Sequence, residues 1–188
     1  MISIIVPTRN PSHLKELQDS FEKLFVGLQV IISLDQDGKG KGWALRQGLE
    51  RATGNAIGFI DSDMDIDPRM LLRLLSFLVD YDIVVGKKSL GKVLFTRKIV
   101  TFLSRIYIKL LFGVNVDTQT GIKLFRRSAL PTWETDGFGC DLEILAKAKR
   151  AGKTMIEVPI EARISERTTC RAILRTLRES LRIRFSLL

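Results

Sequence analysis

The sequence has little histidine, little cysteine and no long hydrophobic run. His13 is the only histidine in 188 residues, which argues against histidine-based zinc sites and Ser-His-Asp catalysis, and we expect it on the surface of the first helix. Cys140 and Cys170 stand far apart without paired spacing, so neither a disulfide framework nor a zinc motif is indicated, and both are expected to be reduced, structural thiols. No hydrophobic run is long enough to span a membrane, and Met1 leads straight into a strand-like segment without a signal peptide. These features predict a protein that is made and kept in the cytosol.

Acidic residues are scarce relative to basic ones. The chain has 30 lysines and arginines against 21 aspartates and glutamates, which gives a formal net charge of +9 and a pI near 9.8. Such a charge points to an anionic partner: a nucleic acid, an acidic lipid or a phosphorylated substrate. Because the chain has no recognised nucleic-acid motif and few aromatic residues for base stacking, we do not expect it to bind nucleic acid.

Short apolar runs rich in β-branched residues alternate with segments whose apolar residues recur at helical spacing. We expect strands at residues 2–6, 30–34, 56–60, 82–86 and 155–162, with Pro7 ending the first, and a polar loop feeding another strand at 117–125. Helices are expected at residues 11–25, 43–52, 68–79, 92–112 and 141–150, and another from residue 169 onward. The alternation predicts one α/β domain at residues 1–165, with a mostly parallel, doubly wound sheet flanked by helices, followed by a helical segment at 166–188.

The stretch A-I-G-F-I-D-S-D-M-D-I-D-P at residues 56–68 is central to the functional prediction. Its apolar half predicts a buried strand, and four carboxylates follow, at Asp61, Asp63, Asp65 and Asp67. The strand delivers these acids to the carboxyl edge of the sheet, where open α/β sheets bind ligands. Carboxylates spaced two apart can share one hard cation, Mg²⁺ or Mn²⁺, which would neutralise a diphosphate. The alternative is that an Asp-rich turn merely ends the strand, and we accept it for Asp67, which precedes a proline at a helix start.

A glycine-rich turn precedes this strand. The segment D-Q-D-G-K-G-K-G at residues 35–42 has glycines and two lysines, which can bring backbone and positive charge close to phosphate oxygens. Glycine-lysine turns are commonly plain loops, so this motif alone leaves both interpretations open.

Two segments combine positive charge with an apolar face. Large apolar residues at 92–112 are interrupted by lysines and arginines, which suits a helix on a membrane surface, and a core helix with extended arginines is an equally good interpretation. From residue 169 onward the pattern predicts a basic amphipathic helix. Such a helix would bind an anionic bilayer, or would pack on the domain or on another subunit of a homo-oligomer.

The ordered set of motifs carries a family resemblance. The motifs are I-I-V-P-T-R-N at 4–10, G-K-G at 40–42, D-S-D at 61–63, D-T-Q-T-G-I-K-L-F-R-R at 117–127, G-F-G-C-D-L-E-I-L-A-K-A-K-R-A-G at 137–152 and E-V-P-I at 157–160. Together they resemble the family-2 glycosyltransferases of GT-A fold, and more narrowly the polyprenyl-phosphate sugar transferases typified by dolichol-phosphate mannose synthase.

The resemblance implies a GT-A fold and inverting transfer of a hexose from a nucleotide sugar to a polyprenyl (dolichyl) phosphate at the cytosolic membrane face. Mannose from GDP-mannose is slightly favoured over glucose from UDP-glucose. Asp61 and Asp63, with Asp65 where relatives often carry glutamine, would hold Mg²⁺ or Mn²⁺ and so stabilise the leaving diphosphate. A phosphate acceptor is already largely anionic at neutral pH, so it needs positioning by cations more than it needs a general base.

The resemblance also assigns roles to further residues. The donor site would be formed by Pro7, Thr8, one of Asp35 or Asp37, Lys41, Arg163 and Arg167. The acceptor site would be formed by Arg97, Lys98 and the loop residues Asp117, Gln119 and Lys123. Asp141 would be a catalytic acidic residue near the acceptor, and its alternative role is a helix-start charge favoured by the helix dipole.

The chain departs from its relatives in the donor half. Residues 34–38 run directly into Gly-Lys-Gly, so that one helix–strand unit is missing and the donor pocket is shortened. Pro11 stands near a position where relatives carry glutamate, and residues 166–170 replace their Gly-x-Ser-Lys. Two alternative functions remain: a soluble family-2 transferase acting on a saccharide hydroxyl, with Asp141 as an essential base, and a catalytically degenerate, membrane-associated partner protein.

Overall fold

The computed structural model describes residues 1–9, 15–16, 18–19, 23, 27–63, 65–88, 95–161 and 170–187, with the backbone alone at 95–98 and 170–176. Its strands are β1 (Ile2–Thr8), β2 (Leu28–Leu34), β3 (Ala56–Ile60), β4 (Ile83–Lys88), β5 (Ile122–Arg126) and β6 (Met155–Ile160). Its helices are α2 (Lys41–Arg51), α3 (Met70–Leu75), α4 (Phe95–Phe112), α5 (Cys140–Arg150) and α6 (Cys170–Ser186), with the 3₁₀ turns η2 (Ser76–Val79) and η3 (Arg127–Ala129).

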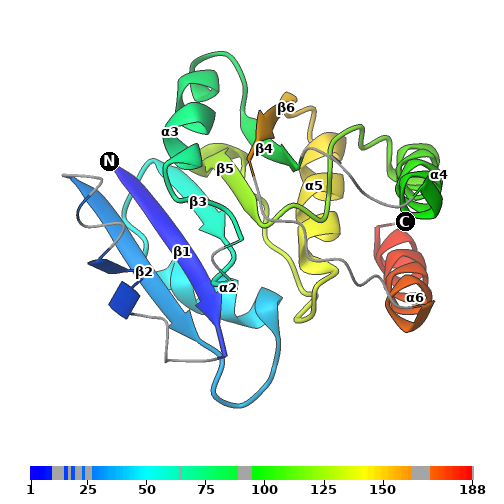
Figure 1. Cartoon of the computed structure of the whole chain (residues 1–188), viewed down its shortest axis with the longest axis horizontal. Coiled ribbons are helices and arrows are strands. Elements are labelled where there is room, and N and C mark those ends of the chain that lie inside the picture. The colour runs from blue at the N-terminus through cyan, green and yellow to red at the C-terminus, as the bar shows by residue number, and fades with distance from the viewer. Residues whose placement is uncertain are drawn as a thin grey trace.

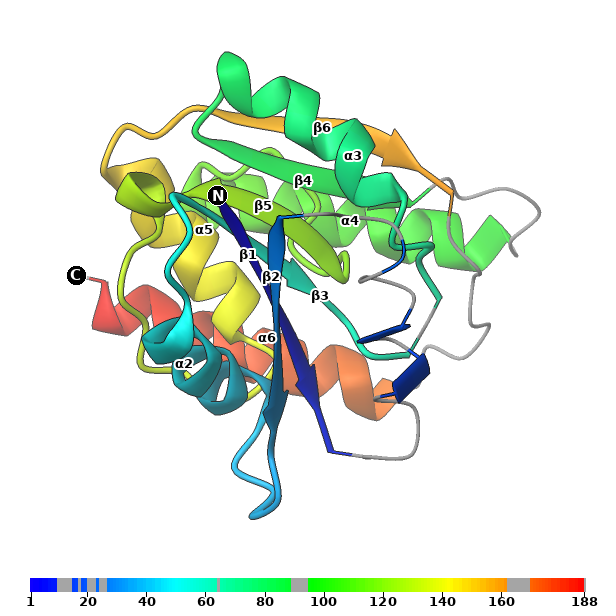
Figure 2. The same cartoon turned by 90° about the vertical axis from the view of Figure 1, so that its left-hand side faces the viewer.

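The six strands form one sheet in the order β2-β1-β3-β5-β4-β6 (Figures 1 and 2). β5 runs antiparallel to both β3 and β4, and the other pairings are parallel. The prediction of an α/β domain with a mostly parallel sheet is therefore confirmed. An antiparallel strand begins at the edge where its parallel neighbours end. The carboxyl end of β3 and the loop that enters β5 consequently meet at one edge of the sheet.

Helices cover both faces of the sheet, because its central strands are buried on both sides and carry apolar residues on both. α3 lies over one face, where its Leu74 packs in a core cluster with Ile4 of β1. α2 and α5 lie over the other face, where Leu145 of α5 shares a second cluster with Phe59 of β3. Figure 1 shows α4 and α6 side by side beyond α5, as an outer layer on that face.

α4 and α6 each bury one side and expose the other. Ile108 of α4 and Ile183 of α6 belong to the core, and the hydroxyl groups of Tyr107 and Ser180 join the two helices at 3.1 Å. The outward side, here called the α4/α6 face, exposes large apolar side chains: Ile99, Phe102, Leu103, Ile106, Leu110, Leu177, Leu181 and Phe185. Across the part of the chain that the structure describes, no helix combines the length and the apolar character needed to cross a membrane.

The predicted elements are largely confirmed, and two of them differ. Pro7 does not end the first strand but lies within β1, in register with Ser33 of β2. It is tolerated because the pairing of β1 with β3 ends at Ile5, so no ladder bond is required from Pro7 on that side. The helix predicted at 68–79 forms as α3 followed by the 3₁₀ turn η2. Most of the predicted first helix, including His13, lies outside the described residues.

Candidate active site

A chain of alternating charges lies at the carboxyl end of β3. Asp61 follows this strand directly, and its Oδ1 is 2.8 Å from Nζ of Lys41, the first residue of α2. The same ammonium group lies 2.8 Å from Oδ2 of Asp141, in the first turn of α5. Oδ1 of Asp141 is in turn 2.8 Å from Nζ of Lys123 on β5. Four segments that are distant in sequence therefore meet through ion pairs between two lysines and two aspartates.

This ion network is buried at its inner end and open at Asp61. The exposed fraction of the side chain is 1% for Lys123, 6% for Asp141, 9% for Lys41 and 31% for Asp61. Burial raises the pKa of Asp141, but Lys123 and Lys41 oppose it and bring that pKa below its usual value. Burial lowers the pKa of Lys41, but Asp141 and Asp61 oppose it and bring that pKa above its usual value. Asp141 is therefore a carboxylate, and Lys41 an ammonium group, at neutral pH.

The loop that enters β5 is tied to the same carboxylate. The backbone N–H of Asp61 donates to the carbonyl oxygen of Gly121 at 2.8 Å, and Nζ of Lys123 donates to that of Thr120 at 2.5 Å. A Cβ on Gly121 would lie 2.3 Å from Oδ2 of Asp61, so a glycine at this position leaves room for the carboxylate. Gly121 was not predicted as a site residue from the sequence, although a glycine directly before a strand is a signal of close approach.

Asp63 and Asp65 follow Asp61 across a turn. In the residues covered by the structure, no three His, Cys, Asp or Glu side chains gather to hold a metal ion, so Asp61, Asp63 and Asp65 are not assembled into a ready-made cluster. Partial burial raises the pKa of Asp63, and the charges of Asp61 and Asp65 raise it further, against the N–H of Asp65 and the charge of Lys88.

The exposed carboxylates suit a cation nonetheless. Mg²⁺ is usually held by one or two carboxylates, with substrate phosphates and water completing its coordination. Asp61 is open on one side, Asp63 is exposed, and their mutual repulsion would be relieved by a bound cation. Asp61 and Asp63 are therefore a donor set that fits Mg²⁺ or Mn²⁺.

The turn after β2 is built around Asp35. This carboxylate accepts the N–H groups of Lys39 at 2.7 Å and Gly40 at 2.8 Å, and Nε of Arg9 at 3.1 Å. Burial raises the pKa of Asp35, but the N–H of Gly40, Arg9 and the N–H of Lys39 together lower it below its usual value. The buried carboxylate of Asp35 thus stabilises the turn through these hydrogen bonds. Asp37, in contrast, is exposed and forms an ion pair with Lys39 at 3.3 Å. Arg9, a partner of Asp35, was missed in the sequence.

The glycines of the Gly-Lys-Gly motif face another part of the chain. A Cβ on Gly42 would lie 2.0 Å from the carbonyl oxygen of Thr135, and one on Gly40 would lie 2.4 Å from that of Asp136. The N–H of Gly42 donates to the carbonyl oxygen of Asp136 at 2.6 Å, and Glu143 of α5 accepts the N–H of Thr135 at 2.8 Å. The prediction that this turn approaches phosphate oxygens stays a prediction, and Gly40 and Gly42 also have a structural role. They let a loop pack on the start of α2, which fixes the lysine of the motif in place.

The other predicted residues surround this centre or lie beyond what the structure describes. Pro7 and Thr8 are buried at the carboxyl end of β1. Asp117 accepts the N–H of Gln119 at 2.9 Å in the loop before β5, and Gln119 is exposed. Four predicted side chains are not described, those of Arg97, Lys98, Arg163 and Arg167. The roles assigned to all these residues stay predictions.

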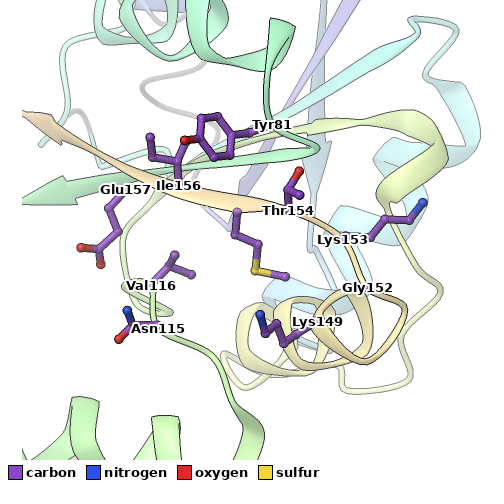
Figure 3. Close-up of a pocket in the computed structure, with 10 residues that line it drawn as sticks. Tyr81, Asn115, Val116, Lys149, Gly152, Lys153, Thr154, Ile156 and Glu157 are labelled. Carbon is purple, nitrogen blue, oxygen red and sulfur yellow. The ribbon is translucent and has the colours of Figure 1, made fainter.

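The structure also has a cavity of about 550 Å³ (Figure 3), and none of the four residues of the ion network lines it. Met155 and Glu157 of β6, Lys149 of α5 and Asn115 of the loop after α4 are among the residues that line it. It lies beside the amino half of an edge strand, whereas Asp61 stands at the carboxyl end of β3. The cavity is therefore distinct from the candidate active site.

Comparison with known proteins gives a consistent picture. Residues 4–132 match the family described as glycosyl transferase family 2. An undecaprenyl-phosphate mannosyltransferase of Micrococcus luteus is 25% identical over 170 residues, which cover 84% of this chain and 70% of that protein. The low-salt glycan biosynthesis hexosyltransferase Agl6 of Haloferax volcanii is 26% identical over 140 residues, which cover 69% of this chain and 34% of that protein.

A solved structure has the same fold. Glucosyl-3-phosphoglycerate synthase from Mycobacterium tuberculosis, in complex with Mn²⁺ and uridine-diphosphate-glucose, superposes with a TM-score of 0.75 at 18% identity. The superposition covers 99% of this chain and 78% of that one. The predicted GT-A architecture is thereby confirmed.

Proposed function

The chain belongs to glycosyl transferase family 2, and on that premise we propose that it transfers a hexose from a nucleotide sugar to a polyprenyl phosphate at a membrane surface. Mannose from GDP-mannose is the favoured donor and glucose from UDP-glucose the second. The acceptor is supported by the similarity to an undecaprenyl-phosphate mannosyltransferase. The UDP-glucose alternative is supported by the structural neighbour that binds this nucleotide sugar.

The observation that carries the proposal is the carboxylate pair at the end of β3. Asp61 is held by Lys41 at 2.8 Å and by the backbone of Gly121, and Asp63 stands exposed beside it. Asp61 and Asp63 would hold Mg²⁺ or Mn²⁺, which when bound would neutralise the leaving diphosphate. The protein's contribution is to hold Asp61 in one position, because its carboxylate is fixed from α2 and its backbone from the loop before β5.

The α4/α6 face supports action at a membrane. α4 carries four basic and no acidic residues, and α6 carries five basic residues and one acidic residue, Glu179. Exposed side chains such as Phe102 and Leu110 add apolar area, with exposed fractions of 64% and 81%. Apolar burial together with basic side chains is how amphipathic helices bind anionic bilayers. We therefore place the enzyme peripherally, with this face toward the cytosolic leaflet.

The donor site is tested by calorimetric titration of GDP-mannose and UDP-glucose, with and without Mn²⁺, into the full chain. We expect Mn²⁺-dependent binding of one donor that Asp63→Asn abolishes. Asp80→Asn is the matched control, because Asp80 is an exposed carboxylate at the end of η2, outside the site. If neither donor binds, with or without metal and lipid vesicles, the transferase proposal is wrong.

The membrane surface is tested by flotation with vesicles that contain an anionic phospholipid. Replacing Phe102 or Leu110 by serine is expected to weaken binding about tenfold, since a large apolar side chain contributes roughly 1.5 kcal/mol or more on burial. Val79→Ser is the matched control, because Val79 is equally exposed but lies in η2, next to α3 on the other side of the sheet. Equal loss with all three variants would remove the α4/α6 face from the proposal.

A further inference from the structure

Asp141 is the acidic residue on which the choice of acceptor depends. A transferase that acts on a hydroxyl group needs a general base within hydrogen-bond reach of that hydroxyl. A phosphate monoester has a second pKa near 6, so it is already largely anionic at neutral pH and needs no base. The surroundings of Asp141 therefore bear on the chemical class of the acceptor.

Both carboxylate oxygens of Asp141 form ion pairs inside the protein. Oδ1 lies 2.8 Å from Nζ of Lys123 and Oδ2 lies 2.8 Å from Nζ of Lys41, and 6% of the Asp141 side chain is exposed. A base must contact the proton that it removes, and this carboxylate instead contacts two ammonium groups. The two lysines also lower the pKa of Asp141 against the effect of burial, which makes it a weak proton acceptor.

Asp141 does not contact Asp61 directly but is connected to it through Lys41. The ammonium group of Lys41 is shared between Asp141 and Asp61, at 2.8 Å from each. Lys123, held by the other oxygen of Asp141, donates to Thr120 in the loop whose Gly121 binds the backbone of Asp61. One buried carboxylate thus positions two cations that support Asp61 from α2 and from β5.

We propose that Asp141 is a positioning residue for Asp61, acting through Lys41 and Lys123, and not the base of the transfer. The inference rests on the proposed function, whose acceptor is a phosphate, and names a further positioning residue for the same site. Its physical consequence concerns metal affinity. When Asp141 is neutralised, Asp61 becomes the remaining carboxylate partner of Lys41 in the network, and the lysine competes more strongly with a cation for it.

The test compares Asp141→Asn with Asp136→Asn in the full chain. The control breaks an exposed ion pair between Asp136 and Arg46 outside the network. Mn²⁺ binding without donor is measured by calorimetry, and kcat and KM for donor are measured with polyprenyl phosphate between pH 6 and 9. Among the described residues, the titratable groups that face Asp141 are Lys41, Lys123 and the thiol of Cys140.

A positioning role predicts that Asp141→Asn weakens Mn²⁺ binding about tenfold or more, as loss of a group that supports a metal ligand typically does. It further predicts a raised KM for donor, a smaller change in kcat, and an unchanged shape of the pH profile. The opposite result is a loss of kcat by about a thousandfold or more, with metal binding and KM unchanged. That result would make Asp141 the base and the acceptor a hydroxyl.

A second variant guards against simple misfolding. Asp141→Asn leaves Lys123 buried without its carboxylate, so the double variant Asp141→Asn/Lys123→Met removes that unpaired charge as well. It should fold, by its circular dichroism and melting curve, and should still bind Mn²⁺ more weakly than the wild type. Unchanged Mn²⁺ affinity in a folded double variant would overturn the proposal. If the wild type binds Mn²⁺ but transfers no sugar, the proposed function fails while the metal comparison still decides the role of Asp141.

Discussion

Substituting Gly121 by alanine is the sharpest single test of the site. The added Cβ would lie 2.3 Å from Oδ2 of Asp61, 2.7 Å from its Cγ and 3.0 Å from its Cβ. Normal contacts between such atoms are about 3.5 Å, so the carboxylate must move by roughly 1 Å. It can do so, because Asp61 is partly exposed and the turn after it is open, but the move separates it from Lys41.

This movement is expected to weaken donor binding more than it lowers the stability of the fold. Disturbing the groups that orient a metal ligand typically costs about tenfold to a hundredfold in metal affinity, so we expect Mn²⁺-dependent donor affinity to fall by about that much. The free energy of unfolding should fall by only about 1 kcal/mol, the low end for an added methyl group, because the clash is with a side chain that can rotate.

The assay is calorimetric titration of donor with Mn²⁺, alongside urea denaturation. Gly137→Ala is the matched control, since a Cβ there meets nothing nearer than 3.6 Å. If Gly121→Ala binds metal and donor as tightly as the control, the carboxylate of Asp61 is not the group that holds the cation, and the site assignment is wrong.

Three further predictions concern stability and reactivity. Gly42→Ala places a Cβ 2.0 Å from the carbonyl oxygen of Thr135, a backbone atom that cannot move freely. The substitution should therefore lower the free energy of unfolding, measured in urea, by about 3 kcal/mol, and a loss below about 1 kcal/mol would show that this loop packs loosely. Burial and the charge of Asp141 raise the pKa of Cys140 to about 12, so the Cys140 thiol should react slowly with thiol reagents at pH 8 until urea is added. The measurement uses the Cys170→Ser variant, and rapid labelling of its native state would refute the prediction. The protonated Cys140 thiol contributes to the free energy of unfolding in full below its unfolded pKa of about 9, and this contribution is lost as the pH rises toward 12. The pKa of Asp35 is lowered on folding, so its carboxylate stabilises the fold above the unfolded pKa of 3.8, and this stabilisation is lost as the pH falls below that value. Asp35→Asn should therefore flatten the acid side of a plot of the free energy of unfolding against pH. An unchanged plot would argue against the buried hydrogen bonds of Asp35.

The strands and helices were predictable because they rest on local patterns. Runs such as 56–60 combine β-branched and aromatic residues, and they end in aspartate or glycine, so their length and type follow from the sequence. The insertion of β5 between β3 and β4 in the opposite direction was not predictable in this way. The apolar pattern of a buried strand is the same whether the strand runs parallel or antiparallel to its neighbours. Its direction is decided by packing with strands that are distant in sequence.

The site was predictable at Asp61 and not at its partners. A carboxylate directly after a buried strand must lie at the sheet edge, so its position follows from local sequence. The pair between Lys41 and Asp141 joins residues 100 positions apart, and nothing local specifies it. The glycines of the Gly-Lys-Gly motif show the same limit. Their lack of a side chain is needed for close approach, but the sequence does not say whether a phosphate or another loop approaches.

The strand order has a consequence for how the chain is made. β4 pairs with β5 and β6, and both are synthesised after it, whereas β1, β2 and β3 can pair as soon as they emerge. A nascent chain that ends after α4 would therefore expose one unpaired edge on β3 and two on β4. Such edges promote association between chains. The arrival of residues 122–126 pairs the edge of β3 and one edge of β4, and the second edge of β4 is paired only when β6 arrives at residues 155–160. Release from the ribosome before β6 has emerged should therefore favour aggregation, most strongly before β5.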